Sequence, residues 1–503
     1  MTRAILFPLA IAFASAPESS PFAFYQENVL GTSLELKVHA RSIREARRAE
    51  TAVLAEIDRL AKIFSGYDPQ SEFSRWTQTR NRPVPVSAEL FEVLSRFDRY
   101  GALTAGALDP AADGVNRLWK RAEAEKRVPS DAELEAAAAA ARDPKWSLDP
   151  IHRTATHLSS APLILNSFTK SYIAGRAART AKTLPGVNGV VVNIGGDLVV
   201  SGPVEEVHIT DPRDPAENAE PAAKIRVRDV AVATSGNYRR GVEIGGRHFS
   251  HIVGPRTGRP VDHILSSTVI APDPSDAGAL ATAFSVLTPE ESARVAASVP
   301  GVEYLLIASD GRRYMSPGWS RWAAFAPQQP GTAPQHPATE HPASPQETPQ
   351  YWNPEDELTV NFELARVSGN YRRPYVGVWI EDSQGNPVRT LAVWRGKPRY
   401  LPDLRVWYAS DRKRQAAGQP MPPSVTGATR SPGKYTLRWD GKDNNGTHVK
   451  FGKYIVNIEA VREHGTHQLI KQEIDFSGEP KQVALPGGTE IASASLTYGR
   501  KTH

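Results

Sequence analysis

Five short segments in the first 260 residues combine glycine, hydroxyl, aromatic and charged side chains in patterns that suit an anionic, aromatic ligand. Two of them are rich in glycine and hydroxyl groups: Val192–Asp197, which contains paired glycines, and Ala233–Tyr238. Paired glycines let the backbone approach a ligand closely, and hydroxyl and N–H groups can bind phosphate oxygens. An ordinary tight turn also explains each of these segments, so neither is specific alone.

The third segment, His251–Pro260, contains a histidine, two arginines and a threonine within ten residues. Arginine can pair with phosphate through two N–H groups, and histidine can shuttle protons. The last two segments are loops: Phe64–Glu72, with aromatic and carboxylate side chains, and Gly106–Pro110, with one carboxylate. Together the five segments predict a pocket for a cofactor such as a nucleotide.

Helices and strands of mixed order must position these segments. Apolar residues at helical spacing predict helices at Ile43–Leu60, Ala88–Leu103, a stretch from the N-cap Ser130 to Arg142, Thr169–Leu184 and Gly278–Leu287. Short strands are predicted between them at Ser33–His39, Val190–Ile194, Val204–Thr210, Ile225–Val230 and Ser267–Ala271. The first domain is therefore expected to be α+β (mixed α/β).

The last 150 residues or so show a different pattern. Apolar and polar residues alternate over Thr359–Leu364, Tyr375–Glu381, Tyr435–Trp439, Lys453–Ala460 and Gln468–Phe476. Glycine- and asparagine-rich turn clusters separate several of these runs. Short strands with such turn signals predict an all-β, immunoglobulin-like sandwich.

A proline-rich stretch divides the chain. Residues 327–350 contain seven prolines and no Phe, Tyr, Trp or branched aliphatic residue, so they cannot bury enough apolar area to fold. We expect a linker there, between domains at 20–326 and 351–503.

Residues 1–16 have a positive Arg3, a short apolar run and an Ala-Ser-Ala cleavage signal, which predicts a secretory signal peptide and a periplasmic protein. An uncleaved N-terminal anchor is the alternative.

Composition excludes several classes of protein. The 503 residues include no cysteine, so a disulfide scaffold, a Cys-ligated metal site and a thiol nucleophile are ruled out. The formal net charge is only +5 and no basic tract occurs, which argues against nucleic-acid binding. No apolar run reaches the length of a transmembrane span. The sequence also has no P-loop and no Gly-x-Ser-x-Gly nucleophile elbow.

Taken in order, the motifs resemble one family. They are Phe64-Ser-x-Tyr67, Ser71-Glu72, Gly106-x-x-Asp109-Pro110 with Leu118-Trp119, Lys170-x-Tyr172, Asn193–Asp197, Thr234-Ser-Gly-x-Tyr238, His251–Pro260 and Ala279–Thr282. Over about residues 25–325 this series is similar to the FAD:protein FMN transferases, the ApbE-type flavin transferases. The resemblance implies a periplasmic enzyme that binds FAD and Mg²⁺, transfers FMN to a Thr or Ser hydroxyl of a target protein, and releases AMP.

The resemblance also assigns site residues. FAD would be bound by Tyr67, Ser71, Glu72, Asp109, Lys170, Asn193, Gly195, Gly196, Asp197, Thr234, Ser235, Gly236 and Tyr238. Catalysis would fall to His251, Arg256 and Thr257, with His251 transferring protons. Metal ligands would be Thr282, Thr169 and Asp276.

Three carboxylates of the family pattern are glycine in this chain. They are the Asp of Lys-Gly-Tyr-x-x-Asp, replaced by Gly175, an Asp shortly after the histidine, replaced by Gly254, and the Asp of Asp-Ala-Leu-Ala-Thr, replaced by Gly278. Asp276 lies near that last position, although helical spacing turns it to another face. Mg²⁺ binding is therefore expected to be weak, and a carboxylate restored at 278 should strengthen it.

The second domain contains a segment that resembles a flavin acceptor. In Ser424-Val-Thr-Gly-Ala-Thr429-Arg430, the residues match Asp-x-x-Ser/Thr-Gly-Ala-Thr/Ser except that Pro423 occupies the Asp position. This similarity implies that Thr429 could receive FMN. A surface turn before a strand is the alternative.

Two functions remain open at this point. The first is an FMN transferase that acts on its own C-terminal domain or on a periplasmic electron-transfer protein. The second is a catalytically degenerate flavin-binding protein with a β-sandwich redox or interaction module. The matched motifs favour the first, and the three glycines favour the second.

Overall fold

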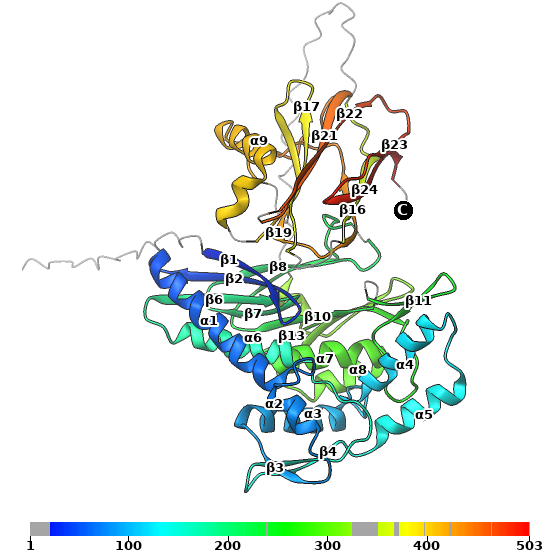
Figure 1. The fold of residues 1–503 in the computed structure, drawn as a ribbon. Helices are drawn as coiled ribbons and strands as arrows, with labels where there is room; N and C mark the ends of the chain where they lie inside the picture. Colours follow the sequence, from blue (N-terminus) through cyan, green and yellow to red (C-terminus); the bar gives the residue numbers. More distant parts are fainter. Residues whose placement is uncertain are drawn as a thin grey trace, which may run out of the picture.

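The computed structural model describes residues 21–214, 216–237, 240–323, 351–366, 372–396, 398–421, 425–463 and 465–501. Among the described residues, the two largest hydrophobic cores are separate, one formed within residues 24–308 and one within residues 352–498. Figure 1 shows them as an N-terminal domain (21–323, blue to green) and a C-terminal domain (351–501, yellow to red). The predicted signal peptide and linker lie outside the described residues.

An eight-stranded antiparallel sheet forms the centre of the N-terminal domain, with strand order β1-β2-β6-β7-β10-β13-β14-β15. Its strands are β1 (Phe22–Val29), β2 (Thr32–Ala40), β6 (Val187–Ile194), β7 (Asp197–Ser201), β10 (Ala231–Gly236), β13 (Ile264–Ala271), β14 (Glu303–Ala308) and β15 (Arg313–Met315). The central strands are apolar on both faces, as expected of strands covered on both sides.

Helices cover one face of this sheet and a hairpin covers part of the other (Figure 1). The helices are α1 (Ile43–Phe64), α2 (Glu72–Thr77), α3 (Ala88–Leu103), α4 (Ala112–Ala124), α5 (Asp131–Arg142), α6 (Thr169–Lys182), α7 (Pro274–Val286) and α8 (Pro289–Ala297). The smaller elements are β3 (Pro83–Pro85), β4 (Trp146–Asp149), β5 (Thr154–His157), β8 (Glu205–Ile209), β9 (Ala223–Val227), β11 (Gly241–Ile244), β12 (Arg247–Ser250) and the 3₁₀ helix η1 (Trp319–Trp322).

The C-terminal domain is rich in strands, with sheets of order β20-β16-β24-β23 and β19-β18-β17-β21-β22. Their strands are β16 (Asp356–Leu364), β17 (Tyr375–Asp382), β18 (Pro387–Arg395), β19 (Thr426–Ala428), β20 (Gly433–Trp439), β21 (Gly452–Val461), β22 (His467–Phe476), β23 (Lys481–Leu485) and β24 (Ile491–Arg500). The two sheets share one core, in which Trp352, Trp439 and Phe476 contact one another.

The prediction of an all-β second domain is wrong in one respect. A helix, α9 (Arg405–Ala416), follows the 3₁₀ helix η2 (Pro398–Asp403) and packs on β17 and β18. Buried Glu459 of β21 accepts hydrogen bonds from the backbone N–H groups of Val406 and Trp407 in its first turn. The helix has few apolar residues, so its sequence shows no strong helical periodicity. The carboxylate of Glu459 and packing against β17 and β18 stabilise it instead.

The two domains contact each other along the β1 edge and the loop between β8 and β9. Glu27 of β1 accepts a hydrogen bond from the hydroxyl of Thr429, at 2.7 Å. Glu217 pairs with Arg430 at 3.0 Å, and Asp214 pairs with Arg438 at 2.6 Å. The contact is therefore polar and rich in charge, as is usual for interfaces between domains of one chain.

No helix in the part of the chain that the structure describes is both long enough and apolar enough to cross a lipid bilayer.

Candidate active site

Four segments of the N-terminal domain meet at one end of the central strands: the β6–β7 turn, the end of β10, the start of α6 and the middle of α7. The hydroxyls of Ser235 and Thr282 lie 3.4 Å apart, and Thr282 donates to the carbonyl of Ser167 at 3.1 Å. Lys170 Nζ lies 3.6 Å from a carboxylate oxygen of Asp197. The structure thus brings together hydroxyl, lysine and carboxylate groups that are distant in sequence, and the Thr282 hydroxyl and its Ser167 carbonyl partner are 115 residues apart.

The glycine pair shapes the turn rather than offering free donors. Gly195 and Gly196 have φ angles of +60° and +99°, which favour glycine. Their N–H groups are already bonded, that of Gly195 to the carbonyl of Ser33 and that of Gly196 to the side-chain oxygen of Asn193. The expectation that both N–H groups face a phosphate is corrected by this geometry. The turn instead places Asp197 beside Lys170.

The start of α6 provides positive potential at the same place. Among the described residues, no side chain caps the helix at Phe168, so its first N–H groups keep their hydrogen-bonding capacity. Lys170 lies in this first turn, with a third of its side chain exposed. Thr169 is buried and donates to the carbonyl of Leu165. A helix N-terminus next to a lysine is suited to bind phosphate oxygens.

His251 follows β12 and is held by the backbone of Arg240. Both the amide N–H and the ring Nδ1 of His251 lie 3.1 Å from the carbonyl oxygen of Arg240. Because a carbonyl only accepts hydrogen bonds, Nδ1 carries the hydrogen and the Nε2 lone pair is left to take up a proton. His251 therefore has the tautomer that a general base needs.

The surroundings of His251 also favour its neutral form. Partial removal from water is the largest cause that lowers the pKa of its imidazole, and the hydrogen bond to the carbonyl of Arg240 opposes this effect. The nearby side chains of Arg240, His248 and Lys170 lower the pKa of His251 further through their electrostatic interaction with it. A histidine with a lowered pKa stays neutral at pH 7 and can accept a proton there.

This gives a pH prediction. If neutral His251 is the active form, kcat/KM falls as the pH drops through the pKa of His251, so the acidic limb should have its midpoint below the ordinary value of about 6.5. Arg240→Gln removes a positive charge but keeps the backbone carbonyl, so it should move that midpoint upward. The check is kcat/KM measured between about pH 5 and 8 for both proteins; a midpoint that does not move contradicts the role of Arg240.

The other candidates around this cluster have local partners. The hydroxyl of Thr234 lies 2.9 Å from that of Thr268 on the neighbouring strand, and Gly236 ends β10. Thr257 donates to the carbonyl of Gly254, and Arg256 lies 3.9 Å from Glu291 with much of its side chain exposed. Tyr238 lies outside the described residues.

The candidates from the first third of the domain mostly support the fold. Ser71 is the N-cap of α2, and Glu72 accepts a hydrogen bond from the N–H of Ser87 at 2.6 Å, which joins α2 to the start of α3. Asp109 pairs with Lys145 at 2.6 Å. Tyr67 is 77% exposed and contacts the side chain of Asn166, so its ring is open to a ligand from solvent.

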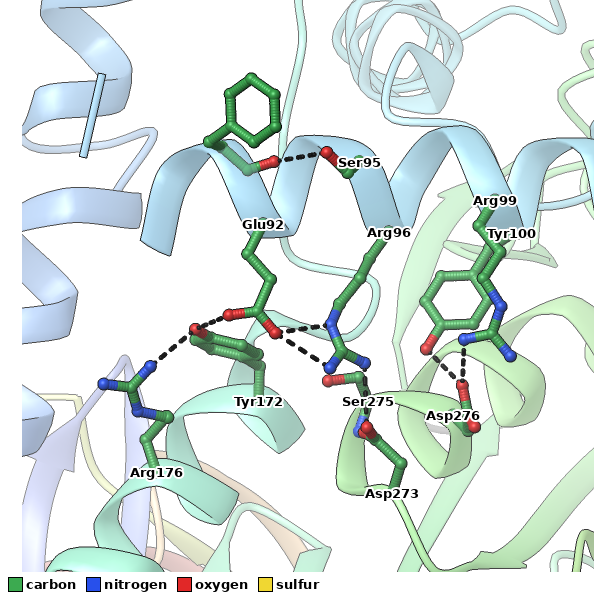
Figure 2. Close-up of polar contacts among 11 residues, drawn as sticks. Glu92, Ser95, Arg96, Arg99, Tyr100, Tyr172, Arg176, Asp273, Ser275 and Asp276 are labelled. Carbon is green, nitrogen blue, oxygen red and sulfur yellow. Dashed lines mark hydrogen bonds and ion pairs between the residues drawn. The ribbon is translucent and has the colours of Figure 1, made fainter. Parts of the chain in front are cut away.

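Asp276 lies away from Thr282. Its carboxylate accepts a hydrogen bond from Tyr100 at 2.6 Å and pairs with Arg99 at 3.0 Å, both on α3 (Figure 2). Thr282 instead points to Ser167 and Ser235. The structure therefore does not bring the predicted metal ligands Asp276 and Thr282 together. This agrees with the helical spacing, which turns Asp276 to another face of the helix.

Figure 2 also shows what fixes α3 against α6 and α7. Glu92 accepts a hydrogen bond from Tyr172 at 2.8 Å and pairs with Arg96, which in turn pairs with Asp273 at the start of α7. Burial, with help from Glu92, raises the pKa of Tyr172 to about 12, so its hydroxyl stays protonated and keeps donating. This network holds the helix ends that border the site.

The Mg²⁺ implied by the resemblance does not fit the groups present. The oxygens that contact Thr282 are the hydroxyl of Ser235 and the carbonyls of Ser167 and Gly278, and all of them are neutral, as is the hydroxyl of Thr282 itself. Mg²⁺ is usually bound through at least one carboxylate. In the described part of the chain no cluster of three or more His, Asp or Glu residues could hold a metal ion.

Sequence reasoning did not single out Arg240 or Ser167. Arg240 is exposed beside His251, and its only signal was a pair of arginines directly after Tyr238. Ser167 contributes through its backbone carbonyl, which leaves no trace in the sequence.

Comparison with known proteins agrees with this geometry. A model of the ApbE family matches residues 30–306, which is 277 of 503 residues, and a model described as a predicted periplasmic protein (DUF2271) matches residues 357–493. The FAD:protein FMN transferase of Haemophilus influenzae is 29% identical over 324 residues, which cover 60% of this chain and 91% of that protein. That of Klebsiella pneumoniae is 28% identical over 321 residues, covering 61% and 91%.

A solved structure supports the fold as well. The crystal structure of the ApbE protein from Thermotoga maritima matches with a TM-score of 0.55 at 26% identity, covering 61% of this chain and all of that chain. The N-terminal domain thus has the mixed α/β fold of the flavin transferases. The chain belongs to the ApbE family, and its β-rich C-terminal domain is of the DUF2271 type.

Proposed function

We propose that this chain transfers FMN from FAD to a Thr or Ser hydroxyl of a target protein in the periplasm. Membership of the ApbE family and the names of its relatives support the reaction class. The observation that carries the proposal for this chain is the meeting of Lys170, the open start of α6 and the hydroxyls of Ser235 and Thr282 at one site. The DUF2271 match supports the periplasmic location.

The reaction balances with the groups present. The acceptor oxygen attacks the phosphorus of the FMN half of FAD, and the bond from this phosphorus to the bridging oxygen breaks, so that AMP leaves. The acceptor proton passes to Nε2 of His251, which is the free ring nitrogen. We assign Lys170 and Arg240, whose charges both act on His251, to offset the negative charge of the pyrophosphate.

Mg²⁺ enters no step of this scheme, because the donor set at Thr282 lacks a carboxylate. Any Mg²⁺ requirement is expected to be weak.

The docked arrangement favours an acceptor on another protein, such as an electron-transfer protein, over Thr429. The Thr429 side chain is 1% exposed and bonded to Glu27 on the edge strand β1. Four strand spacings separate β1 from β10, which is about 19 Å at about 4.8 Å each. Modification of Thr429 therefore requires the domains to separate. The C-terminal domain, with its two packed sheets in which all neighbouring strands except β18 and β19 are antiparallel, is proposed to be an immunoglobulin-like interaction module.

The test uses the full-length protein, FAD and a peptide with the sequence pattern Asp-x-x-Ser-Gly-Ala-Thr. We expect AMP release and a peptide mass increase equal to FMN less water. A peptide with Ala at the last position is the control and should stay unmodified. Binding of FAD without AMP release would support the second candidate, a degenerate flavin-binding protein, which the three glycines favour.

A further inference from the structure

Two of the glycines that replace carboxylates lie where α6 and α7 touch. A Cβ atom added at Gly278 would lie 2.2 Å from the hydroxyl oxygen and 2.9 Å from the Cβ of Ser171. A Cβ atom added at Gly175 would lie 2.8 Å from Pro274. The two contacts are four residues apart on each helix and follow opposite chain directions, as in a close antiparallel helix pair.

Ser171 fills the space in front of Gly278 at a cost. Its side chain is 2% exposed, and its hydroxyl is a buried group without a hydrogen-bond partner among the described residues. Buried hydroxyls are nearly always bonded, so an unpaired one indicates a position held by packing. The family pattern has glycine at 171 and a carboxylate at 278. This chain has the larger side chain on α6, at Ser171, and the glycine on α7, at Gly278.

Among the described residues, no other carboxylate near α7 takes the place of the one missing at 278. Asp276 is committed to Tyr100 and Arg99, and Asp273 to Arg96 and the N–H of Ser275 (Figure 2). Asp197 is next to Lys170, whose positive charge opposes a cation there.

We propose that Ser171, held against Gly278 where α6 and α7 touch, closes the position at which the family pattern holds a divalent cation, so that this chain binds none on α7. Restoring a cation site then takes two changes, since aspartate fits at 278 only when residue 171 has no Cβ. This corrects the expectation that a carboxylate at 278 alone would suffice. The bearing on catalysis rests on the proposed transferase function, whereas the binding claim does not.

The experiment titrates MnCl₂ into the full-length protein by calorimetry, without FAD, and measures thermal unfolding of each variant. Wild type should show no saturable site up to about 1 mM. S171G/G278D should bind one Mn²⁺ at least tenfold more tightly than wild type, and adding Thr282→Val should remove that binding. S171A/G278D, which differs from S171G/G278D by one methyl group, should unfold at a lower temperature and gain no site.

Three results would overturn the proposal. One is saturable Mn²⁺ binding by wild type that Thr282→Val abolishes. Another is G278D alone binding Mn²⁺ as well as the double variant does. The third is S171G/G278D that unfolds at the wild-type temperature yet binds no Mn²⁺. Failure of wild type to release AMP from FAD would instead refute the transferase function and leave these binding results standing.

Discussion

Replacing His251 by alanine is expected to lower the rate of FMN transfer by about 10²–10⁴-fold, the usual contribution of a positioned general base. The ring is oriented by the carbonyl of Arg240 and kept neutral by its surroundings, so its loss removes the proton acceptor at Nε2. FAD affinity should change little, because the cations assigned to the pyrophosphate, Lys170 and Arg240, remain. Single-turnover AMP release and calorimetric FAD titration measure the two effects separately.

A matched control is His152→Ala. His152 is 74% exposed and pairs only locally with Asp149, so its loss should leave both rate and affinity unchanged. Lys170→Ala should differ from His251→Ala, because its main effect should be on the affinity for FAD rather than on the rate of AMP release. A His251→Ala protein that retains more than a tenth of the wild-type rate would refute the assignment of His251 as the base.

Much of the fold follows from local sequence signals. Ser130 caps α5 with a full capping box through Glu133, and α3 spans the residues expected from apolar spacing. The helix expected at Gly278–Leu287 begins four residues earlier. Asp273 is its N-cap and Pro274 its first residue, a start signal that the apolar pattern does not include.

The candidate site is only partly visible in the sequence, because the same residue types serve turns and ligands. Ser71 and Glu72 fit a motif yet fix helix ends. Gly195 and Gly196 form the expected turn, but their N–H groups are bonded within the protein. Which partner a polar group takes is decided by tertiary structure, so motif order indicates the site better than it indicates each residue's role.

Gly175 and Gly278 illustrate the same limit. In the sequence they appear only as missing carboxylates, whereas in the structure each is a contact between α6 and α7. The partners Ser171 and Pro274 are about 100 residues away along the chain. The missing carboxylate at Gly278 and the larger side chain at Ser171 can be related to each other only in the structure, where α6 and α7 are in contact.

The interface between the domains was beyond sequence reasoning for a similar reason. Glu217 and Arg430 are 213 residues apart, and each would be interpreted alone as a solvated charge. In the structure Arg430 also lies over the ring of Trp394, at 5.3 Å. These contacts hold Thr429 against Glu27 and so govern whether the acceptor-like segment is accessible.

Breaking this pair should expose Thr429. Glu217→Arg places two like charges at an interface where they now attract. Losing a charged hydrogen bond of about 1.5–3 kcal/mol raises the fraction of molecules with separated domains roughly ten- to a hundredfold. We expect wild type incubated with FAD to carry little FMN on Thr429, and Glu217→Arg to carry much more. Tryptic mass spectrometry of the Thr429 peptide measures this, and small-angle scattering reports domain separation through the radius of gyration.

The swapped pair E217R/R430E is the matched control, because it restores the attraction with the charges exchanged and should return Thr429 to its shielded state. Glu217 is the better single site, since Arg430 adjoins Thr429 and its loss could also change recognition of the acceptor. Full modification of Thr429 in wild type would show that the docked interface does not shield it. An expanded Glu217→Arg protein with unmodified Thr429 would exclude that hydroxyl as an acceptor and leave a separate protein as the target.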